Sequence, residues 1–257
     1  MEEIFMSTIN DKLWIWGHPT NSLKGCFGLT MDSDVSPVDG AEYLGANNIF
    51  YVPMGRPVDR DLCTQQMQHI PQVGWSMERE EQVWELIELK KKYPNITKAV
   101  FDDFFNPENV HTNFTNYSVK KMLEMKEKLH EAGIEMWVVL YTRLLENDIR
   151  PYLKLFDGVS YWYWHEASEE EFNEKIKWLF ENTPGQKKMV GCYLYDFGNE
   201  REMPAETVRS QLDKNLTFIR EGKIEGIILH TNAIGGMGYV GYEEAKIWAE
   251  EHSNEVL

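Results

Sequence analysis

The chain alternates, over almost its whole length, between short apolar runs rich in aromatic residues and longer amphipathic segments. Most of the short runs are apolar at consecutive positions, which is typical of parallel strands that are buried on both faces. The segments between them place apolar residues at spacings of three and four, which predicts helices with one buried face. Eight strands are expected, at residues 13–16, 48–53, 72–75, 98–102, 135–141, 159–164, 189–195 and 226–230.

Each expected strand is followed by a segment that can form a helix. The clearest helices are expected at residues 77–92, 119–130, 172–180, 204–220 and 243–252. Ser168 precedes three glutamates and is a typical helix N-cap, while Gly133 and Gly222 stand where C-cap glycines are expected. No glycine-rich phosphate loop follows the first strand, which disfavours a doubly wound sheet. The pattern therefore predicts an α/β fold in which residues 1–257 form a single (β/α)8 TIM-barrel domain.

Charge and hydropathy exclude several classes of partner. The 42 Asp and Glu residues outnumber the 26 Lys and Arg residues, which gives a net charge of −16. Because phosphate groups are bound by clustered Lys and Arg, we expect no nucleic-acid and no membrane partner. No apolar run approaches the roughly 18 residues of a membrane span, so a soluble protein is expected. The first residues lack a secretory signal pattern, but a cleaved signal would leave the same sequence, so the compartment stays open, as does the oligomeric state.

Polar and aromatic residues gather just after the expected strands. In a TIM barrel the carboxyl ends of all eight strands meet at one mouth, where catalytic residues lie. Carboxylates in a partly apolar mouth suit acid–base catalysis, and aromatic faces pack against sugar rings. The predicted catalytic residues are Asp102, Asp103, Glu166 and Asp196. The predicted substrate-binding residues are His18, Arg56, Trp75, Tyr141, Arg143, Trp164, His165, Tyr195, His230 and Asn232.

Asp102 and Asp103 form the most informative pair, because two acids directly follow an apolar strand and have phenylalanines on both sides. Consecutive strand residues point to opposite faces. Both carboxylates can therefore reach one pocket only if the strand ends there and Asp103 turns inward. Two like charges held close together force one carboxyl to keep a proton near neutral pH. A proton donor beside an anion is what the cleavage of a glycosidic bond requires.

An adjacent Asp pair after the fourth barrel strand resembles the O-GlcNAc-hydrolase-type glycoside hydrolases. The Tyr195-Asp196 pair resembles the Tyr-Asp of chitinase-like barrels in the same wider clan. The resemblance implies that Asp102 steers the acetamido group of the substrate, that Asp103 is the general acid/base, and that Tyr195 contacts the acetamido group. The sequence departs from these families in its first strand, which lacks a Gly-Phe-Tyr-Gly type of opening, and in lacking the acidic strand motif of chitinases.

Several of these residues also have structural interpretations. Glu166 is placed to be a first-turn acid of the next helix, and Asp196 to stabilise a loop as an Asx turn. His18 and His230 could each be buried structural histidines. Arg143, like Arg56, could offset the acidic mouth or bind a uronate, sulfate or phosphate.

Three functions remain open. The first is a glycoside hydrolase that acts through carboxylates on a carbohydrate substrate, with no metal and no cofactor. The second is a metal-dependent barrel isomerase or hydrolase, whose candidate ligands are His18, Asp102, Glu166, Asp196 and His230. The third is a non-catalytic barrel that binds carbohydrate. Chelator sensitivity would indicate the second function, and binding without turnover the third.

Overall fold

The barrel predicted from the sequence is confirmed. The computed structural model describes residues 7–29, 33–105, 117–145, 148–163, 166–253 and 255–257. Parallel strands close into a barrel in the order β1-β10-β7-β6-β5-β4-β3-β2. The barrel strands are β1 (Leu13–Gly17), β2 (Asn48–Tyr51), β3 (Gln72–Met77), β4 (Ile96–Phe101), β5 (Glu135–Tyr141), β6 (Gly158–Trp162), β7 (Lys187–Tyr193) and β10 (Gly226–His230).

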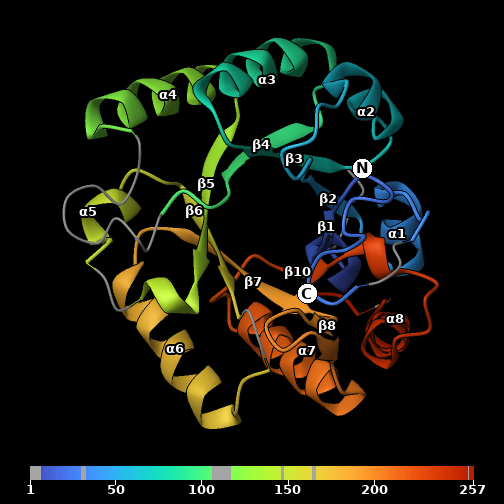
Figure 1. The fold of residues 1–257 in the computed structure, drawn as a ribbon. Helices are drawn as coiled ribbons and strands as arrows, with labels where there is room; N and C mark the ends of the chain where they lie inside the picture. The colour runs from blue at the N-terminus through green and yellow to red at the C-terminus, as the bar shows by residue number, and fades with distance from the viewer. Residues whose placement is uncertain (1–6, 30–32, 106–116, 146–147, 164–165, 254) are drawn as a thin grey trace, which may run out of the picture.

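Helices surround the barrel, as Figure 1 shows in a view along its axis. They are α1 (Pro37–Tyr43), α2 (Arg60–Gln66), α3 (Glu80–Lys92), α4 (Val119–Glu131), α5 (Arg150–Leu153), α6 (Glu169–Asn182), α7 (Ala205–Arg220) and α8 (Val240–His252). Short 3-10 helices occur at η1 (Ile9–Lys12), η3 (Thr142–Leu144) and η4 (Asn232–Ile234). A small antiparallel hairpin of β8 (Tyr195–Asp196) and β9 (Arg201–Glu202) follows β7. Among the described helices, none has the length and apolar character needed to cross a bilayer.

The strands lie where the apolar runs predicted them, but some ends differ. β6 ends at Trp162 and β7 at Tyr193, because the apolar sequence continues beyond the last residue that pairs with a neighbouring strand. β3 runs on to Met77, so α3 begins at Glu80 instead of residue 77. The Gln82 side chain accepts hydrogen bonds from the backbone N–H groups of Glu78 (2.6 Å) and Arg79 (3.2 Å), which fixes this helix start.

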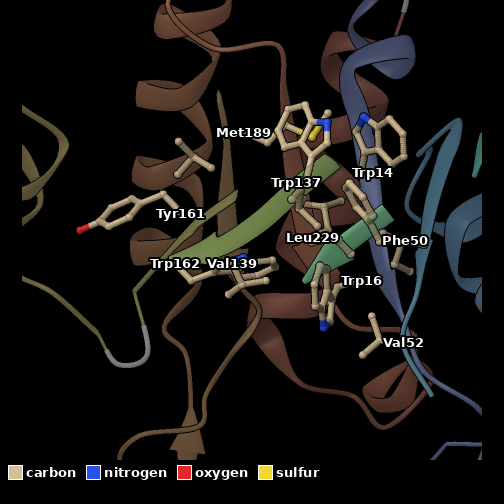
Figure 2. Packing of buried hydrophobic residues seen from close by; sticks show 14 of the residues in the cluster. Trp14, Trp16, Phe50, Val52, Trp137, Val139, Tyr161, Trp162, Met189 and Leu229 are labelled. Carbon is tan, nitrogen blue, oxygen red and sulfur yellow. The ribbon is translucent and has the colours of Figure 1, made fainter. Parts of the chain in front are cut away.

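Aromatic rings fill the interior of the barrel, as Figure 2 shows for Trp14, Trp16, Phe50, Trp137 and Trp162. The rings of Trp16 and Trp162 are 5.2 Å apart although β1 and β6 are not neighbours, so this contact crosses the barrel. Space for such rings comes from glycines on adjacent strands. A Cβ atom at Gly158 would lie 2.4 Å from the Trp137 ring, and one at Gly191 would lie 2.0 Å from the Trp162 ring. Both strands thus need glycine where a neighbouring tryptophan covers them.

Candidate active site

A pocket of about 100 Å³ opens at the carboxyl ends of the strands, where TIM-barrel enzymes carry their active sites. Every barrel strand except β3 contributes a side chain, either from the strand or from the residues just after it. The pocket is lined by Trp16, His18, Leu23, Phe27, Met54, Asp102, Asp103, Tyr141, Trp162, Tyr193, Phe197 and His230. A larger hollow of about 650 Å³ lies outside the barrel along α6 and α7, and residues that precede β7 and β10 line it, at the amino ends of the strands.

Asp102 and Asp103 both reach the pocket, as the sequence argument required. β4 ends at Phe101, and Asp103 then adopts a left-handed backbone conformation with φ of +46°. Aspartate tolerates this region better than most residues. The turn brings the second carboxylate to the same side as the first, and the Asp103 N–H donates to Asp102 Oδ1 (2.9 Å).

The Asp102 carboxyl keeps its proton unusually well. Burial raises the pKa of Asp102 to about 7, and the negative charge of Asp103 acts in the same direction. The Tyr141 O–H donates to Asp102 Oδ1 (3.1 Å) and acts in the opposite direction, because it stabilises the anion. Glu78, a half-turn before α3, is a further carboxylate whose charge raises this pKa. Near neutral pH, Asp102 is therefore poised between its acid and its anion.

His18 and His230 form an uncharged pair in the pocket wall. His18 Nδ1 lies 3.1 Å from the carbonyl oxygen of Val52, which only accepts hydrogen bonds, so Nδ1 carries the hydrogen. The bare His18 Nε2 lies 3.4 Å from His230 Nε2, which then acts as the donor. Burial lowers the pKa of His18 to about 4 and that of His230 well below its usual range. Both rings are neutral at pH 7.

Asn232, a predicted substrate-binding residue, is fully buried behind His18 and does not line the pocket in the described structure. Its Oδ1 accepts from the His18 N–H (2.8 Å), and its Nδ2 donates to the carbonyls of His18 (2.9 Å) and Val35 (2.7 Å). Asn232 therefore fixes the backbone that carries His18.

We expect Asn232→Ala to lower the free energy of unfolding by about 3 kcal/mol, because it leaves buried backbone groups without partners. Urea denaturation measures the change. Asn182→Ala is the matched control, since Asn182 makes one hydrogen bond, to the Trp178 carbonyl, and a loss below about 1 kcal/mol is expected there. Equal losses of unfolding free energy in the two variants would contradict the role of Asn232 in fixing the backbone that carries His18.

Two predicted aromatic residues face away from the pocket: Trp75, because successive strand residues alternate, and Tyr195, because β7 ends at Tyr193 and Tyr195 belongs to β8. Gly74 faces the interior, where Phe50 covers it, so Trp75 points outward. Its ring lies 4.7 Å from the Arg60 guanidinium and 4.6 Å from the Tyr51 ring. Tyr195 is likewise buried outside the pocket, where it packs against Phe197 and Tyr239.

Glu166 and Asp196 come together with Arg201, away from the pocket lining. Asp196 is fully buried, and its oxygens accept from the Asn199 N–H (3.1 Å), the Asn199 amide (2.8 Å) and Arg201 Nε (3.2 Å). Burial would raise the pKa of Asp196, but these hydrogen bonds leave it lowered. Arg201 Nη2 also binds Glu166 (2.8 Å), whose other oxygen accepts from Thr207 (2.8 Å). We call this Asp196–Arg201–Glu166 group the hairpin latch.

Arg56 and Arg143 are exposed at the rim. Arg56 Nη2 donates to the Ser22 carbonyl (3.3 Å), and the Arg143 guanidinium lies 4.7 Å from the centre of the Tyr141 ring. Trp164 and His165 lie outside the described residues. Among the residues that the structure does describe, no three His, Cys, Asp or Glu side chains are arranged to hold a metal ion.

The pocket also contains residues that the sequence argument did not select. For those on barrel strands the signal is the period of two, since Trp16 precedes His18 and Tyr193 follows Gly191 on the inward face of β7, whereas the residues outside the strands have no such signal. The residues that were missed are Trp16, Leu23, Phe27, Met54, Trp162, Tyr193 and Phe197.

Comparison with known proteins identifies the fold and no family. No family model matches the chain, and no curated protein matches its sequence. Among solved structures, a family 18 chitinase from Crocus vernus is similar over 94% of this chain and 98% of its own, with 12% identity and a TM-score of 0.55. The tryptophan synthase α-subunit of Pyrococcus furiosus is similar over 96% and 99%, with 14% identity and a TM-score of 0.54. Barrels of different chemistry thus match this chain equally well.

Proposed function

We propose that the chain is a glycoside hydrolase that cleaves a glycosidic bond by acid–base chemistry at the Asp102–Asp103 pair. The observation that carries the proposal is the Asp102 carboxyl, whose pKa is raised to about 7 in a pocket that also holds a second carboxylate. A carboxyl with a pKa near the working pH is the general acid that glycosidic cleavage needs. The resemblance of the Asp pair to O-GlcNAc-hydrolase-type enzymes supports the same reaction class.

The hydrogen bonds of Asp102 favour one role for each acid. Oδ1 already accepts from Tyr141 and from the Asp103 N–H, so the proton resides on Oδ2. Asp102 Oδ2–H then donates to the glycosidic oxygen as the bond to the anomeric carbon breaks. Asp103 faces the same pocket and stabilises the positive charge that develops at that carbon. Water then adds to the anomeric carbon and gives its proton to the Asp102 carboxylate, which restores the acid. This gives Asp102 the acid role that the family resemblance implies for Asp103.

The aromatic walls fit a sugar. The rings of Trp16, Trp162 and Tyr193 surround the acids, and Trp162 and Tyr193 lie 5.2 Å apart. Apolar ring faces of sugars pack against such surfaces, while the carboxylates bind hydroxyl groups. The likeness to a chitinase barrel is compatible with this reading, although at 12% identity it concerns the fold alone.

The metal-dependent alternative has less support from the arrangement of its candidate ligands. His18, Asp102 and His230 line the pocket, whereas Glu166 and Asp196 are bound to Arg201. The non-catalytic alternative shares the aromatic walls and differs only in turnover.

A panel of 4-nitrophenyl glycosides, with the N-acetylglucosaminide included, tests the proposal. We expect turnover by the wild type that resists chelators and inhibition by a thiazoline-type mimic of N-acetylglucosamine. Loss of activity with a chelator would favour the metal-dependent barrel. Binding of the mimic without turnover on any glycoside would favour the non-catalytic barrel.

A further inference from the structure

The pocket is small for the reaction proposed above. Its volume of about 100 Å³ compares with about 300–1,000 Å³ for ordinary ligand sites. Two phenylalanines from outside the barrel strands narrow it: Phe27, between β1 and α1, and Phe197, in the turn between β8 and β9. Their rings meet edge to face at 5.7 Å.

Phe197 is the more firmly held of the two. It is 2% exposed, and its ring lies 4.8 Å from His230, 5.6 Å from Tyr193 and 5.1 Å from Tyr195. Its N–H donates to the Tyr195 carbonyl (3.1 Å). Phe197 therefore forms a fixed wall, whereas Phe27 is only half-buried.

The hairpin latch supports this wall. Asp196 is the residue directly before Phe197, and its three hydrogen bonds close the turn from Asp196 to Arg201. Arg201 then ties the turn to Glu166, and Thr207 of α7 binds the same glutamate. Asp196 and Glu166, which the sequence predicts to be catalytic, are thus placed to position the Phe197 side chain.

The inner surface of the pocket disfavours an anionic group. His18 and His230 are neutral at pH 7, and apart from the Asp pair the other lining side chains are aromatic rings, Leu23 and Met54. A carboxylate or sulfate there would lose its hydration beside two uncharged imidazole rings, and the Asp pair would repel it. Of the rim arginines, Arg56 donates to the Ser22 carbonyl, whereas the Arg143 guanidinium lies over the Tyr141 ring and its positive charge acts on the Tyr193 hydroxyl.

We propose that Phe197, held by the hairpin latch, is the specificity-determining residue of this site, which accepts glycosides whose enclosed ring substituent is small and carries no negative charge. An acetamido or hydroxymethyl group meets this description, and a uronate, a sulfate or a longer acyl chain does not. The inference rests on the proposed glycosidase function and adds the substrate class.

The test compares three 4-nitrophenyl substrates: the N-acetylglucosaminide, its N-butyryl counterpart and the glucuronide. For the wild type we expect kcat/KM to fall about 10-fold or more from acetyl to butyryl, because extra methylene groups must fit against a fixed ring. No turnover of the glucuronide is expected. In Phe197→Ala, the ratio of kcat/KM for the N-butyryl substrate to kcat/KM for the N-acetyl substrate should rise about 10-fold.

Further variants separate specificity from stability. Phe197→Leu keeps apolar volume and should raise the ratio by a smaller factor, even if Phe197→Ala folds poorly. Phe218→Ala removes a half-buried ring on α7 that packs on Phe180, outside the barrel, and should leave the ratio unchanged. Arg201→Met should raise the ratio by loosening the turn, and Arg201→Lys should restore part of the selectivity at unchanged thermal stability.

The outcomes distinguish this inference from the function on which it rests. If the wild type turns over the N-acetylglucosaminide but both Phe197 variants keep its butyryl-to-acetyl ratio, the role of Phe197 is overturned while the glycosidase stands. Turnover of the glucuronide at a comparable rate overturns the exclusion of anionic substituents. Failure of the wild type on these substrates and on every other glycoside of the panel removes both proposals.

Discussion

Asp102→Asn is expected to lower kcat/KM by about 10²- to 10⁴-fold on glycosides with poor leaving groups, because it removes the proton donor. The asparagine keeps an oxygen that accepts from Tyr141 and from the Asp103 N–H, so the pocket should keep its shape. On activated aryl glycosides, whose leaving groups need little protonation, the loss should be much smaller. Steady-state kinetics on both substrate classes gives the measurement.

Asp148→Asn is the matched control, since Asp148 is an exposed acid that pairs with Arg150 (2.7 Å) outside the pocket. Its kinetics should equal those of the wild type. An Asp102→Asn enzyme that loses the same factor on both substrate classes would remove Asp102 as the general acid.

The same substitution has a consequence for stability that needs no substrate. The folded pKa of about 7 lies above the ordinary value of 3.8, so ionised Asp102 destabilises the fold. This cost is absent below about pH 4, grows as pH rises, and is complete above pH 7, where it reaches at most about 4 kcal/mol. Asp102→Asn should therefore be more stable than the wild type at pH 8, and the difference should vanish near pH 4. Urea denaturation at both pH values checks this, and a constant difference would contradict it.

The barrel was predictable because its physical cause is repetitive. Consecutive apolar residues are needed wherever a strand is covered on both faces, and that pattern recurs at most of the barrel strands. The ends of the strands were less predictable than their positions, as Tyr195 shows. It continues the apolar run of β7, yet it belongs to β8, because strand pairing ends at Tyr193 and hydrophobicity does not record that.

The site was predictable where one strand end determined it and unpredictable where distant segments meet. Asp102 and His18 follow from the alternation of a single strand. Trp75 was selected for its aromatic ring, whereas the alternation gives the inward positions to its neighbours. Nothing local in the sequence shows that Arg201 would draw Glu166 and Asp196 together, because the latch joins separate loops.

The pH dependence of kcat/KM should have an alkaline limb with a midpoint near 7, since the donor form of Asp102 is present below its pKa and lost above it. Above the midpoint, kcat/KM should fall about tenfold per pH unit, as expected for the loss of one proton. A profile that stays flat from pH 6 to 9 on a substrate with a poor leaving group would be incompatible with this assignment.

Substitutions beside Asp102 should move this limb in opposite directions. Asp103→Asn removes a charge that raises the Asp102 pKa, so the limb should move to lower pH. Tyr141→Phe removes a hydrogen bond that lowers the Asp102 pKa, so the limb should move to higher pH. Tyr43→Phe, which alters an exposed hydroxyl bound to Glu243, should leave it in place. Carbon-13 NMR titration of the Asp102 carboxyl gives the same pKa values without any substrate, and movement of both variants in one direction would refute the electrostatic coupling on which the proposed acid depends.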